Sequence, residues 1–416
     1  MAREMKNSGI EWIDEIPANW KVMPHKYIMH KQKDICEHYN GEDIISLTMG
    51  GVIVRDLTAG GKMPTTFDGY QYVEPEDLLM CLFDIDVTPR CVGVVRNYGL
   101  TSPAYSRFKV HNGYYNCYYD YLLRFIDDEK VFIHLSKNLR SSLTETDFGA
   151  IKTIVPPYEE QKRIADFLDR KCAEIDTVIE KTKATIEEYK KLKQSIISEV
   201  AINGVRTNRA VKNSGVEYVG NIPFEWEVFK NSKLFRENVR QPQPNDISLS
   251  LSQVDGLVAT DDMKEKAMKT STYEGWKRVC IGDLVLNRFK AHLGVLFAAG
   301  LEGMVSFHYG VYEPQIPLIT KYYEYLCHTD AYRAIYANKS NGMVVGLQNL
   351  SNANFYSVKS LYPPIEEQQE IVDYLDNKCA KIDKLIADKT HLLEELENYK
   401  KSVIYEYVTG KKEVVL

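Results

Sequence analysis

Side chains suited to contacting nucleic acid gather at one point in each half of this 416-residue chain. In the second half, the segment LVLNRFKAHLG ends a predicted strand in amide, basic and imidazole groups, and a Ser-Phe-His-Tyr run follows it. The candidates there are Asn287, Arg288, Lys290, His292, Ser306, His308 and Tyr309. Arginine, lysine, serine and tyrosine bind phosphates, whereas arginine, lysine and asparagine also read base edges.

The first half offers a related but more acidic set. Its aligned segment, LMCLFDIDVTPRCVG, contains two aspartates and one arginine, and basic and hydroxyl residues follow it. The candidates are Arg90, Arg96, Ser102, Tyr105, Arg107 and Lys109. For every residue of both sets, a solvated surface side chain is the alternative to a nucleic-acid contact.

A third group of candidates lies ahead of a predicted helix. The segment SNGMVVGLQN ends in Gln348 and Asn349. Amide side chains can form two hydrogen bonds with adenine in the major groove. These two residues are therefore further candidates for reading bases.

The sequence lacks the motifs of enzymes that act on nucleic acids. AGGKMPTT at 59–66 has neither the spacing nor the hydroxyl residue of a phosphate-binding loop. VPPYEE is similar to the Asn/Asp-Pro-Pro-Tyr motif of amino-methyltransferases, but Val155, and Tyr362 in a second copy, replace its polar first residue. The close aspartate pairs have no downstream Glu-x-Lys partner, and the nine histidines form no HExxH motif. We expect no catalytic residue, metal site or cofactor in this chain.

An internal repeat supplies the elements that position the candidates. PPYEEQKRIADFLDRKCAEID at 156–176 matches PPIEEQQEIVDYLDNKCAKID at 363–383, at an offset of 207 residues. NSGIEWIDEIPANW at 7–20 matches NSGVEYVGNIPFEW at 213–226, and a fainter match pairs 67–83 with 273–289, both at 206. One unit is thus used twice, and two copies favour a pseudo-twofold arrangement over a solenoid.

Each Pro-Pro pair is expected to begin a long helix. Proline ends the preceding strand, and Glu-Glu fills the first turn, where negative charge suits the helix dipole. Apolar residues then recur at steps of three and four, from Ile164 to Val200 and from Ile371 to Tyr407, without proline or glycine. About 37 residues would make a rod of roughly 55 Å. The two stripes predict an antiparallel, coiled-coil-like helix pair that holds the diverged segments at opposite ends.

The diverged segments, 21–155 and 227–362, predict mixed α/β domains built from short strands and glycine turns. The tyrosines at 114, 115, 118, 119 and 121 are expected to pack a helix into the core, with stacking on nucleic acid as the alternative. The fold class is α+β. The predicted order is an opening motif with the first diverged domain (1–155), a spacer helix (156–205), an opening motif with the second diverged domain (206–362) and a second spacer helix (363–416).

Composition narrows the class of protein. No apolar run approaches the ~20 residues of a membrane span, and the first residues lack a secretory apolar core, so a cytoplasmic protein is expected. Eight cysteines without a CxxC pair or zinc-spaced histidines are expected to act as small buried hydrophobes. The net charge of −6 argues mildly against a basic nucleic-acid coat protein. That charge divides unevenly, however, since 227–362 carries +2, 21–155 carries −2, and the helical segments 156–205 and 363–416 carry −1 and −4.

The pattern resembles the specificity subunits of type I restriction–modification systems over essentially the whole chain. The resemblance rests on the twin PPxEEQxxIxDxLDxKCAxID helices, the twin opening motifs and the diverged stretches between them. It implies that 21–155 and 227–362 are target recognition domains, one for each half of a split duplex DNA site. It also implies a non-catalytic role in phage defence, with the helical rod setting the length of the gap between the half-sites.

The resemblance further implies partners. Two methyltransferase subunits would bind the spacer helices and use S-adenosylmethionine to methylate adenine, and restriction/translocase subunits would use ATP and Mg²⁺; no membrane partner is expected. Two alternatives stay open. A methyltransferase or nuclease with a disguised site predicts S-adenosylmethionine binding or DNA cleavage by the isolated chain. A helical scaffold with sugar- or protein-binding end domains predicts no salt-sensitive binding to duplex DNA.

Overall fold

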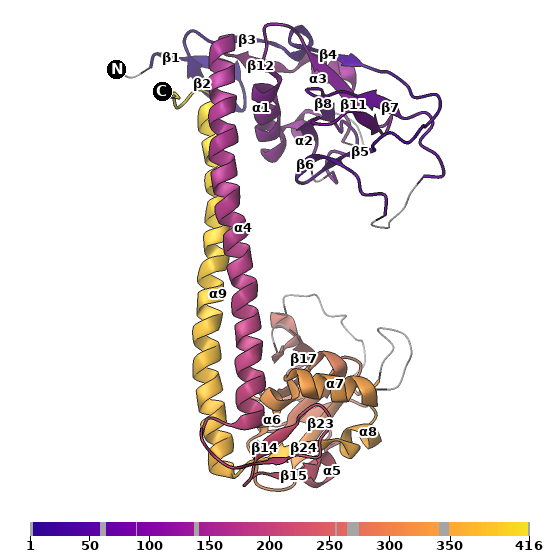
Figure 1. Ribbon diagram of the computed structural model, residues 1–416, viewed down its shortest axis with the longest axis vertical. Helices are drawn as coiled ribbons and strands as arrows, with labels where there is room; N and C mark the ends of the chain where they lie inside the picture. Colours follow the sequence, from indigo (N-terminus) through magenta and orange to yellow (C-terminus); the bar gives the residue numbers. More distant parts are fainter. Residues whose placement is uncertain are drawn as a thin grey trace. The chain divides into compact units, whose positions relative to one another are not determined.

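The computed structural model describes residues 3–58, 64–88, 90–136, 141–253, 256–263, 274–340 and 349–414. The chain divides into two compact units (Figure 1). Unit 1 comprises Met1–Lys183 together with His391–Leu416, and unit 2 comprises Ala184–Thr390. Unit 2 is therefore continuous in sequence, whereas unit 1 is assembled from two separate stretches.

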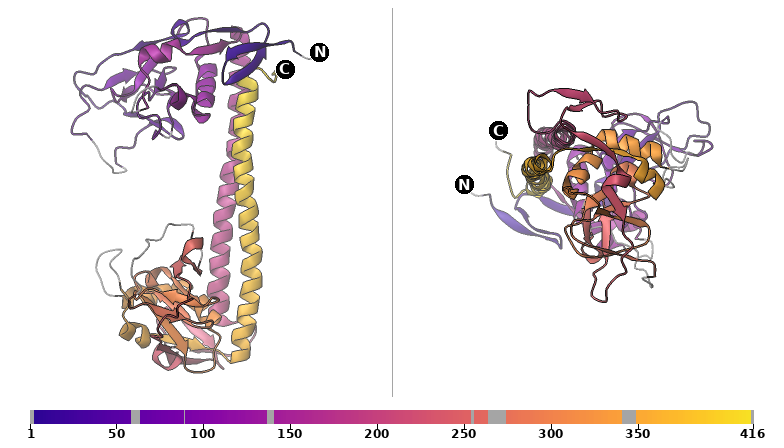
Figure 2. Two further views of the ribbon diagram at one scale, coloured as in Figure 1. Left: turned by 180° about the vertical axis from the view of Figure 1, so that it is seen from behind. Right: turned by 90° about the horizontal axis from the view of Figure 1, so that it is seen from below.

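Two long helices contribute to both units. They are α4 (Tyr158–Asn203) and α9 (Ile365–Val408), and within each unit they lie side by side and run antiparallel (Figure 2). In unit 1 the Lys400 ammonium lies 2.6 Å from the Asp176 carboxylate, and in unit 2 Lys193 pairs with Asp383 at the same distance. The repeated sequence thus places the same ion pair between the helices twice, which confirms the predicted helix pair and internal repeat.

Unit 1 contains a four-stranded antiparallel sheet in the order β4-β11-β8-β9. Its strands are β4 (Met29–Gln32), β11 (Ser106–Val110), β8 (Leu78–Met80) and β9 (Val92–Val94). Two-stranded ladders surround it: β1 (Met5–Ile10) with β2 (Ile13–Pro17), β3 (Lys21–Pro24) with β12 (Lys152–Val155), β5 (Ile45–Thr48) with β6 (Gly51–Val54), and β7 (Gln71–Val73) with β10 (Gly99–Thr101). The shorter helices are η1 (His25–Tyr27), α1 (Asn116–Asp128), α2 (Val131–Leu135) and α3 (Glu145–Ala150).

Unit 2 repeats this plan, with the sheet order β16-β23-β20-β21. Its strands are β16 (Phe235–Glu237), β23 (Tyr309–Pro314), β20 (Leu284–Asn287) and β21 (Leu296–Ala298). The ladders are β13 (Val211–Asn213) with β14 (Asn221–Pro223), β15 (Glu227–Lys230) with β24 (Lys359–Tyr362), β17 (Leu249–Ser252) with β18 (Gly256–Ala259), and β19 (Lys277–Val279) with β22 (Gly303–Val305). The shorter helices are α5 (Asn231–Leu234), η2 (Thr260–Asp262), η3 (Ala291–Leu293), α6 (Thr320–Cys327), α7 (Asp330–Lys339) and α8 (Asn352–Ser357). The α+β prediction is confirmed.

The helical segment predicted from Ile319 to Asn338 divides into α6 and α7. Thr329 separates them because its hydroxyl accepts a hydrogen bond from the Tyr332 N–H at 3.3 Å, which caps the start of α7. A threonine in this role satisfies an amide that would otherwise lack a partner at a helix start. The break turns the second helix back over the loop that contains η3.

A buried tryptophan in each opening motif fixes the start of a long helix. The Trp20 indole N–H donates to the Glu160 carboxylate at 3.0 Å, and the Arg3 guanidinium pairs with the same carboxylate at 2.6 Å and lies 5.4 Å from the Trp20 ring. In unit 2, Trp226, Glu367 and Arg209 form the same cluster, with the corresponding distances 2.9, 2.5 and 5.5 Å. These two Trp-Glu-Arg clusters explain why the motif glutamate and tryptophan are repeated.

The motif glutamine links each long helix to its sheet domain. The Gln161 side-chain oxygen accepts from the Tyr115 N–H at 2.8 Å, while its amide donates to the Pro156 carbonyl at 2.8 Å. Gln368 makes the equivalent bonds in unit 2. Each helix also ends in a glycine with a left-handed backbone, Gly204 at φ +75° and Gly410 at φ +73°. A Cβ on Gly410 would lie 2.6 Å from Pro17, so glycine is required there.

The tyrosine-rich helix packs into the core as predicted. Tyr118 and Tyr119 are fully buried, and the Tyr118 hydroxyl donates to the Val408 carbonyl of α9 at 2.7 Å. Tyr322 occupies the equivalent place in unit 2 and donates to Ala201 at 3.1 Å. The cysteines are all free thiols and are buried or half-buried, as expected for small hydrophobes.

No described helix is long and apolar enough to cross a membrane. Within the same residues, no group of three or more histidine, cysteine, aspartate or glutamate side chains is arranged to hold a metal ion.

Candidate nucleic-acid interface

The strand register brings two loops together at one end of each sheet. In unit 1, Met80 at the end of β8 pairs with Ser106 at the start of β11. In unit 2, Asn287 at the end of β20 pairs with Tyr309 at the start of β23. The loop after the first strand and the turn before the second must therefore meet. We call this edge the loop end of the sheet.

In unit 1 the loop end surrounds a hollow of about 300 Å³. The Phe83 and Tyr105 rings stack with their centroids 6.4 Å apart, and the β5–β6 hairpin adds Thr48 and the exposed Met49. Arg90 also lines the hollow and lies 3.7 Å from the Asp128 carboxylate. Burial raises the pKa of the Tyr105 hydroxyl, so this ring keeps its proton. The surface combines apolar area, hydroxyl groups and one guanidinium.

In unit 2 the loop end is more aromatic and carries an exposed cation. The His308 ring lies 5.6 Å from the Phe289 ring and 3.9 Å from the Phe307 ring, and all three side chains are exposed. Lys290 follows Phe289 and is also exposed, without an ion pair among the described residues. Tyr309 is half-buried, and burial raises the pKa of its hydroxyl. Apolar contact with base edges and contact with phosphates are the chemistry that such a surface can offer to nucleic acid.

The turn residues among the predicted candidates mainly shape these loops. The Ser102 hydroxyl accepts from the Ala104 N–H at 3.3 Å, and the Ser306 carbonyl accepts from the Tyr309 N–H. The Asn287 side chain accepts from the Phe289 and Lys290 amides at 3.1 and 3.3 Å. Their side-chain or backbone groups are therefore already engaged within the loops.

Two predicted arginines are engaged by side chains of their own domain, one of them buried and the other half-buried. Arg107 is buried and donates to the Asp77 carboxylate at 2.5 Å and to the Tyr72 carbonyl at 3.0 Å. Arg288 pairs with Glu237 at 2.7 Å and donates to the Asn352 side chain at 2.8 Å. Both guanidiniums therefore stabilise their own domain. The backbone carbonyl of Arg288 also accepts a hydrogen bond from the Leu350 N–H, which connects the segment before α8 to the loop end.

The pKa values of the two carboxyl groups beside Arg107 shift in opposite directions, for different reasons. Burial raises the pKa of Asp77, against the opposing effect of the backbone amide and the guanidinium that contact it. The exposed Glu74 carboxyl has a lowered pKa because Lys109 hydrogen-bonds to it and Arg107 lies nearby. Lys109 is thus paired with Glu74, at 3.1 Å.

Not every predicted candidate reaches the loop end. Arg96 is exposed but follows β9, whose last residue, Val94, pairs with the first residue of β8, so it lies at the opposite end of the sheet. His292 lies in η3 within the loop after β20 and is half-buried. Asn349 is exposed beside Leu350, and Gln348 lies outside the described residues.

The sequence reasoning missed the aromatic residues of the loop ends. Phe83 and Phe289 are the last residues of the matched segments 67–83 and 273–289, and both are exposed. Phe307 lies between two predicted candidates and is more than half exposed. The signal was present in the repeat, because a phenylalanine that recurs after a strand in two otherwise different loops indicates a shared role.

A family model and a curated protein that match this chain both describe specificity subunits or domains of type I restriction systems. Residues 277–398 match the family model described as the type I restriction modification DNA specificity domain. A curated protein of Methanocaldococcus jannaschii, the putative type I restriction enzyme MjaX specificity subunit, is 27% identical over 322 residues, which cover 70% of this chain and 67% of that protein.

Two solved structures share the fold over nearly their whole length. One comes from a study of complex assembly and conformational transition of the type I R-M system. It superposes with a TM-score of 0.69 at 15% sequence identity, and the match covers 95% of this chain and 99% of that chain. The HsdS subunit from Thermoanaerobacter tengcongensis has a TM-score of 0.51 at 15% identity, with coverages of 95% and 98%. At these identities the two structures support the fold alone.

Proposed function

We propose that this chain, which belongs to the specificity subunits of type I restriction–modification systems, reads a bipartite duplex DNA site with one loop end for each half-site. The observation that carries the proposal is the contrast between the loop ends and the frame behind them. The Trp-Glu-Arg clusters and the sheet order are the same in both units, whereas the loop-end side chains differ. One frame that presents two different surfaces suits two different half-sites.

Affinity in this proposal comes from aromatic and hydroxyl contacts as much as from charge. Unit 2 offers the exposed Lys290, while the unit 1 hollow offers Arg90. Few free cations mean few released counterions, and therefore modest binding by the isolated chain with a shallow salt dependence. The assembled complex would supply the remaining phosphate contacts.

The partners in this proposal are two copies of a methyltransferase subunit, together with restriction/translocase subunits. The support is a repeated exposed apolar pair on the long helices. Val178 and Tyr399 in unit 1 lie next to the Asp176–Lys400 ion pair in sequence, and Leu192 and Leu385 in unit 2 lie next to Lys193–Asp383; all four are between 44% and 50% exposed. Equal surfaces in the two units suit two copies of one partner helix.

The chemistry would belong to those partners. S-adenosylmethionine, ATP and Mg²⁺ are assigned to the partner subunits, and this chain is proposed to hold no cofactor. Methylation of a base inside a duplex requires that the base leave the stack. This chain would therefore stay bound to the flanking DNA while the methyltransferase subunit acts.

Methylome sequencing tests the proposal directly. Cells would express the chain with its partner subunits, and adenine methylation would define the bipartite motif. Exchange of residues 21–155 for the domain of another family member should then change one half-site only. A change in both halves, or in neither, would contradict the assignment of one domain to each half-site.

A point variant resolves the same question at the loop end. Phe83→Ala should relax the first half-site, because an aromatic side chain can contact a thymine methyl group in the major groove, and loss of one specified base pair costs about 1–3 kcal/mol. Tyr27 is the matched control: it is exposed in the same unit but precedes β4, whose Met29 pairs with the far end of β11. Tyr27→Ala should leave the motif unchanged, and an equal effect of both variants would contradict the proposed surface.

A further inference from the structure

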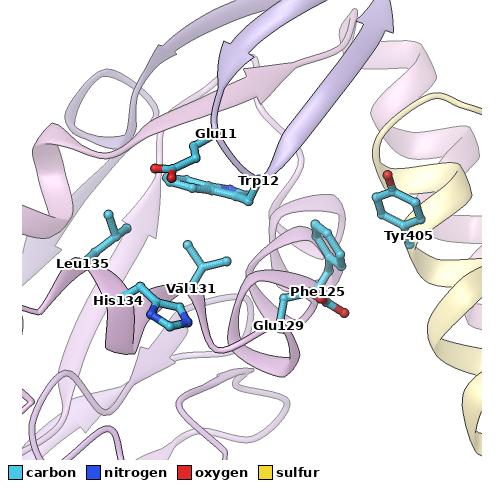
Figure 3. A pocket seen from close by; sticks show the side chains of 8 residues that line it. All are labelled: Glu11, Trp12, Phe125, Glu129, Val131, His134, Leu135 and Tyr405. Atoms are coloured by element: carbon cyan, nitrogen blue, oxygen red, sulfur yellow. The ribbon is translucent and has the colours of Figure 1, made fainter.

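Unit 1 contains a second cavity, of about 590 Å³, away from the loop end. It lies between the turn of the β1–β2 hairpin, the end of α1, the start of α2 and α9 (Figure 3). The side chains that matter for its chemistry are Glu11, Trp12, Phe125, Glu129, Val131 and Tyr405. This volume falls within the range of sites for small molecules, roughly 300–1,000 Å³.

Aromatic rings form a large part of its wall. Figure 3 shows the Trp12 indole on one side of the cavity and the Phe125 ring on another. The Phe125 and Tyr405 ring centroids are 5.1 Å apart, with their planes inclined by 35°. The faces of such rings carry negative electrostatic potential and attract cations.

The cavity edge already shows this attraction within the chain itself. The Lys411 ammonium lies 4.5 Å from the centroid of the Tyr405 ring and also donates to its hydroxyl. The Tyr405 side chain therefore already interacts with a cation of the chain itself, Lys411. The Trp12 and Phe125 side of the cavity has no equivalent cation among the described residues.

Two carboxylates make the cavity negative. Glu11 and Glu129 are exposed and line it, and neither has an ion pair within the described part of the chain. Among the described residues that line the cavity, His134 is the one basic side chain, and no lysine or arginine joins it. Lys401 lines a smaller hollow beside it, together with Phe125 and Glu129. Aromatic walls are an arrangement that proteins use to bind organic ammonium groups, and the two carboxylates would add charge of the opposite sign.

Unit 2 does not repeat this arrangement. Tyr218 takes the place of Trp12, and its hydroxyl accepts a hydrogen bond from the Asn338 side chain at 2.9 Å. In the alignment that matches the two tyrosine-rich helices, Phe125 corresponds to Thr329 and Glu129 to Arg333. A cation thus stands where unit 1 has a free carboxylate, so the cavity lies outside the duplicated frame that serves DNA and the twin partners.

We propose that this cavity binds a small organic cation of the alkylammonium class. The ammonium group would lie against Trp12 and Phe125, with Glu11 and Glu129 balancing its charge. Val131 would contact the alkyl part of the ligand. Each chain would hold one such cation, and the assignment does not depend on the proposed DNA-reading function.

Calorimetric titration of the full chain tests the site with choline chloride as the probe. The control ligand is 3,3-dimethylbutan-1-ol, which has the shape of choline without its charge. Choline should bind at least about tenfold more tightly than the neutral alcohol, because only the cation interacts with the ring faces and carboxylates. Failure of choline to bind at concentrations up to about 10 mM, or equal binding of the two ligands, would overturn the proposal.

Point variants locate the binding event. Glu11→Gln and Glu129→Gln should each weaken choline binding by about three- to tenfold, because an exposed or half-exposed charge pair contributes modestly. Glu217 is the matched control, since it occupies the position of Glu11 in the second opening motif. Glu217→Gln should leave the affinity unchanged. Because Glu11 and Glu129 are exposed, unaltered urea midpoints would show that the variants still fold, and an equal effect of Glu217→Gln would overturn the location.

Discussion

The Trp-Glu-Arg cluster of unit 2 allows a quantitative prediction about Glu367→Gln. The Glu367 side chain is only 1% exposed and pairs with Arg209, whose side chain is 14% exposed. Loss of one partner of a fully buried pair costs about 3–5 kcal/mol. Arg209 keeps its hydrogen bond to the Asn203 carbonyl at 2.7 Å and its contact with the Trp226 ring. A glutamine can also still accept the indole N–H, so we expect a loss of about 2–3 kcal/mol.

Urea unfolding followed by tryptophan fluorescence measures this loss. With an m-value of about 1–3 kcal/mol per molar urea, the midpoint of the affected transition should fall by about 1 M. Glu160→Gln in unit 1 should cost less, about 1–2 kcal/mol, because its partner Arg3 is 21% exposed and solvent screens the pair more. The order of the two variants is therefore part of the prediction.

A neighbouring ion pair on the same helix provides the control. Glu370 pairs with Arg206 at 2.7 Å, but both side chains are about half exposed, so Glu370→Gln should cost at most about 1 kcal/mol. A shift for Glu367→Gln no larger than that for Glu370→Gln would refute the reasoning from burial. In a double-mutant cycle, Glu367→Gln and Arg209→Met should be non-additive by about 1–3 kcal/mol.

Three further outcomes are expected. Gly410→Ala should destabilise unit 1 by about 2 kcal/mol more than Gly9→Ala in urea unfolding, because both glycines have a positive φ but only a Cβ on Gly410 would collide with the opening motif; equal costs would contradict the packing argument. Burial lowers the pKa of His328 to about 4, so the unfolded chain takes up a proton near pH 6.5 before the native state does, and stability is lost as the pH falls from 6.5 towards 4. At about pH 5 the loss is about 2 kcal/mol, and His328→Asn should remove this contribution from the pH profile of the urea midpoint, whereas that of His25, whose pKa burial also lowers to about 4, remains. Lys290→Ala should reduce the slope of log K against log salt by about one for DNA carrying the second half-site, whereas Lys233→Ala, at the opposite end of the same sheet, should leave the slope unchanged.

The sequence predicted the frame because the frame is repeated. A match at a fixed offset identified the long helices, and heptad-like steps identified the faces that meet. Both conclusions rest on local periodicity, which survives in the chain regardless of tertiary context. The α+β class followed from short strands and glycine turns for the same reason.

The candidate site could be predicted only in part, because exposure depends on residues distant in sequence. Arg107 is an attractive phosphate ligand by type, but Asp77, thirty positions earlier, holds it in the core. Arg288 is similarly held by Glu237 on a different strand. Phe83 and Phe289 are not predicted by polar contacts with bases and phosphates, although aromatic side chains can contact thymine methyl groups in the major groove.

The discontinuity of unit 1 has a consequence for the order of folding during synthesis. Unit 2 is encoded without interruption from Ala184 to Thr390, so all its residues are synthesised before residues 391–408. The core of unit 1, however, includes Val403, Ile404 and Val408 of α9. The unit that is translated first must therefore wait, with an incomplete core, until after the second unit is synthesised. Closing contacts across more than two hundred residues is slow, which makes unit 1 the half most dependent on protection from aggregation in the cell.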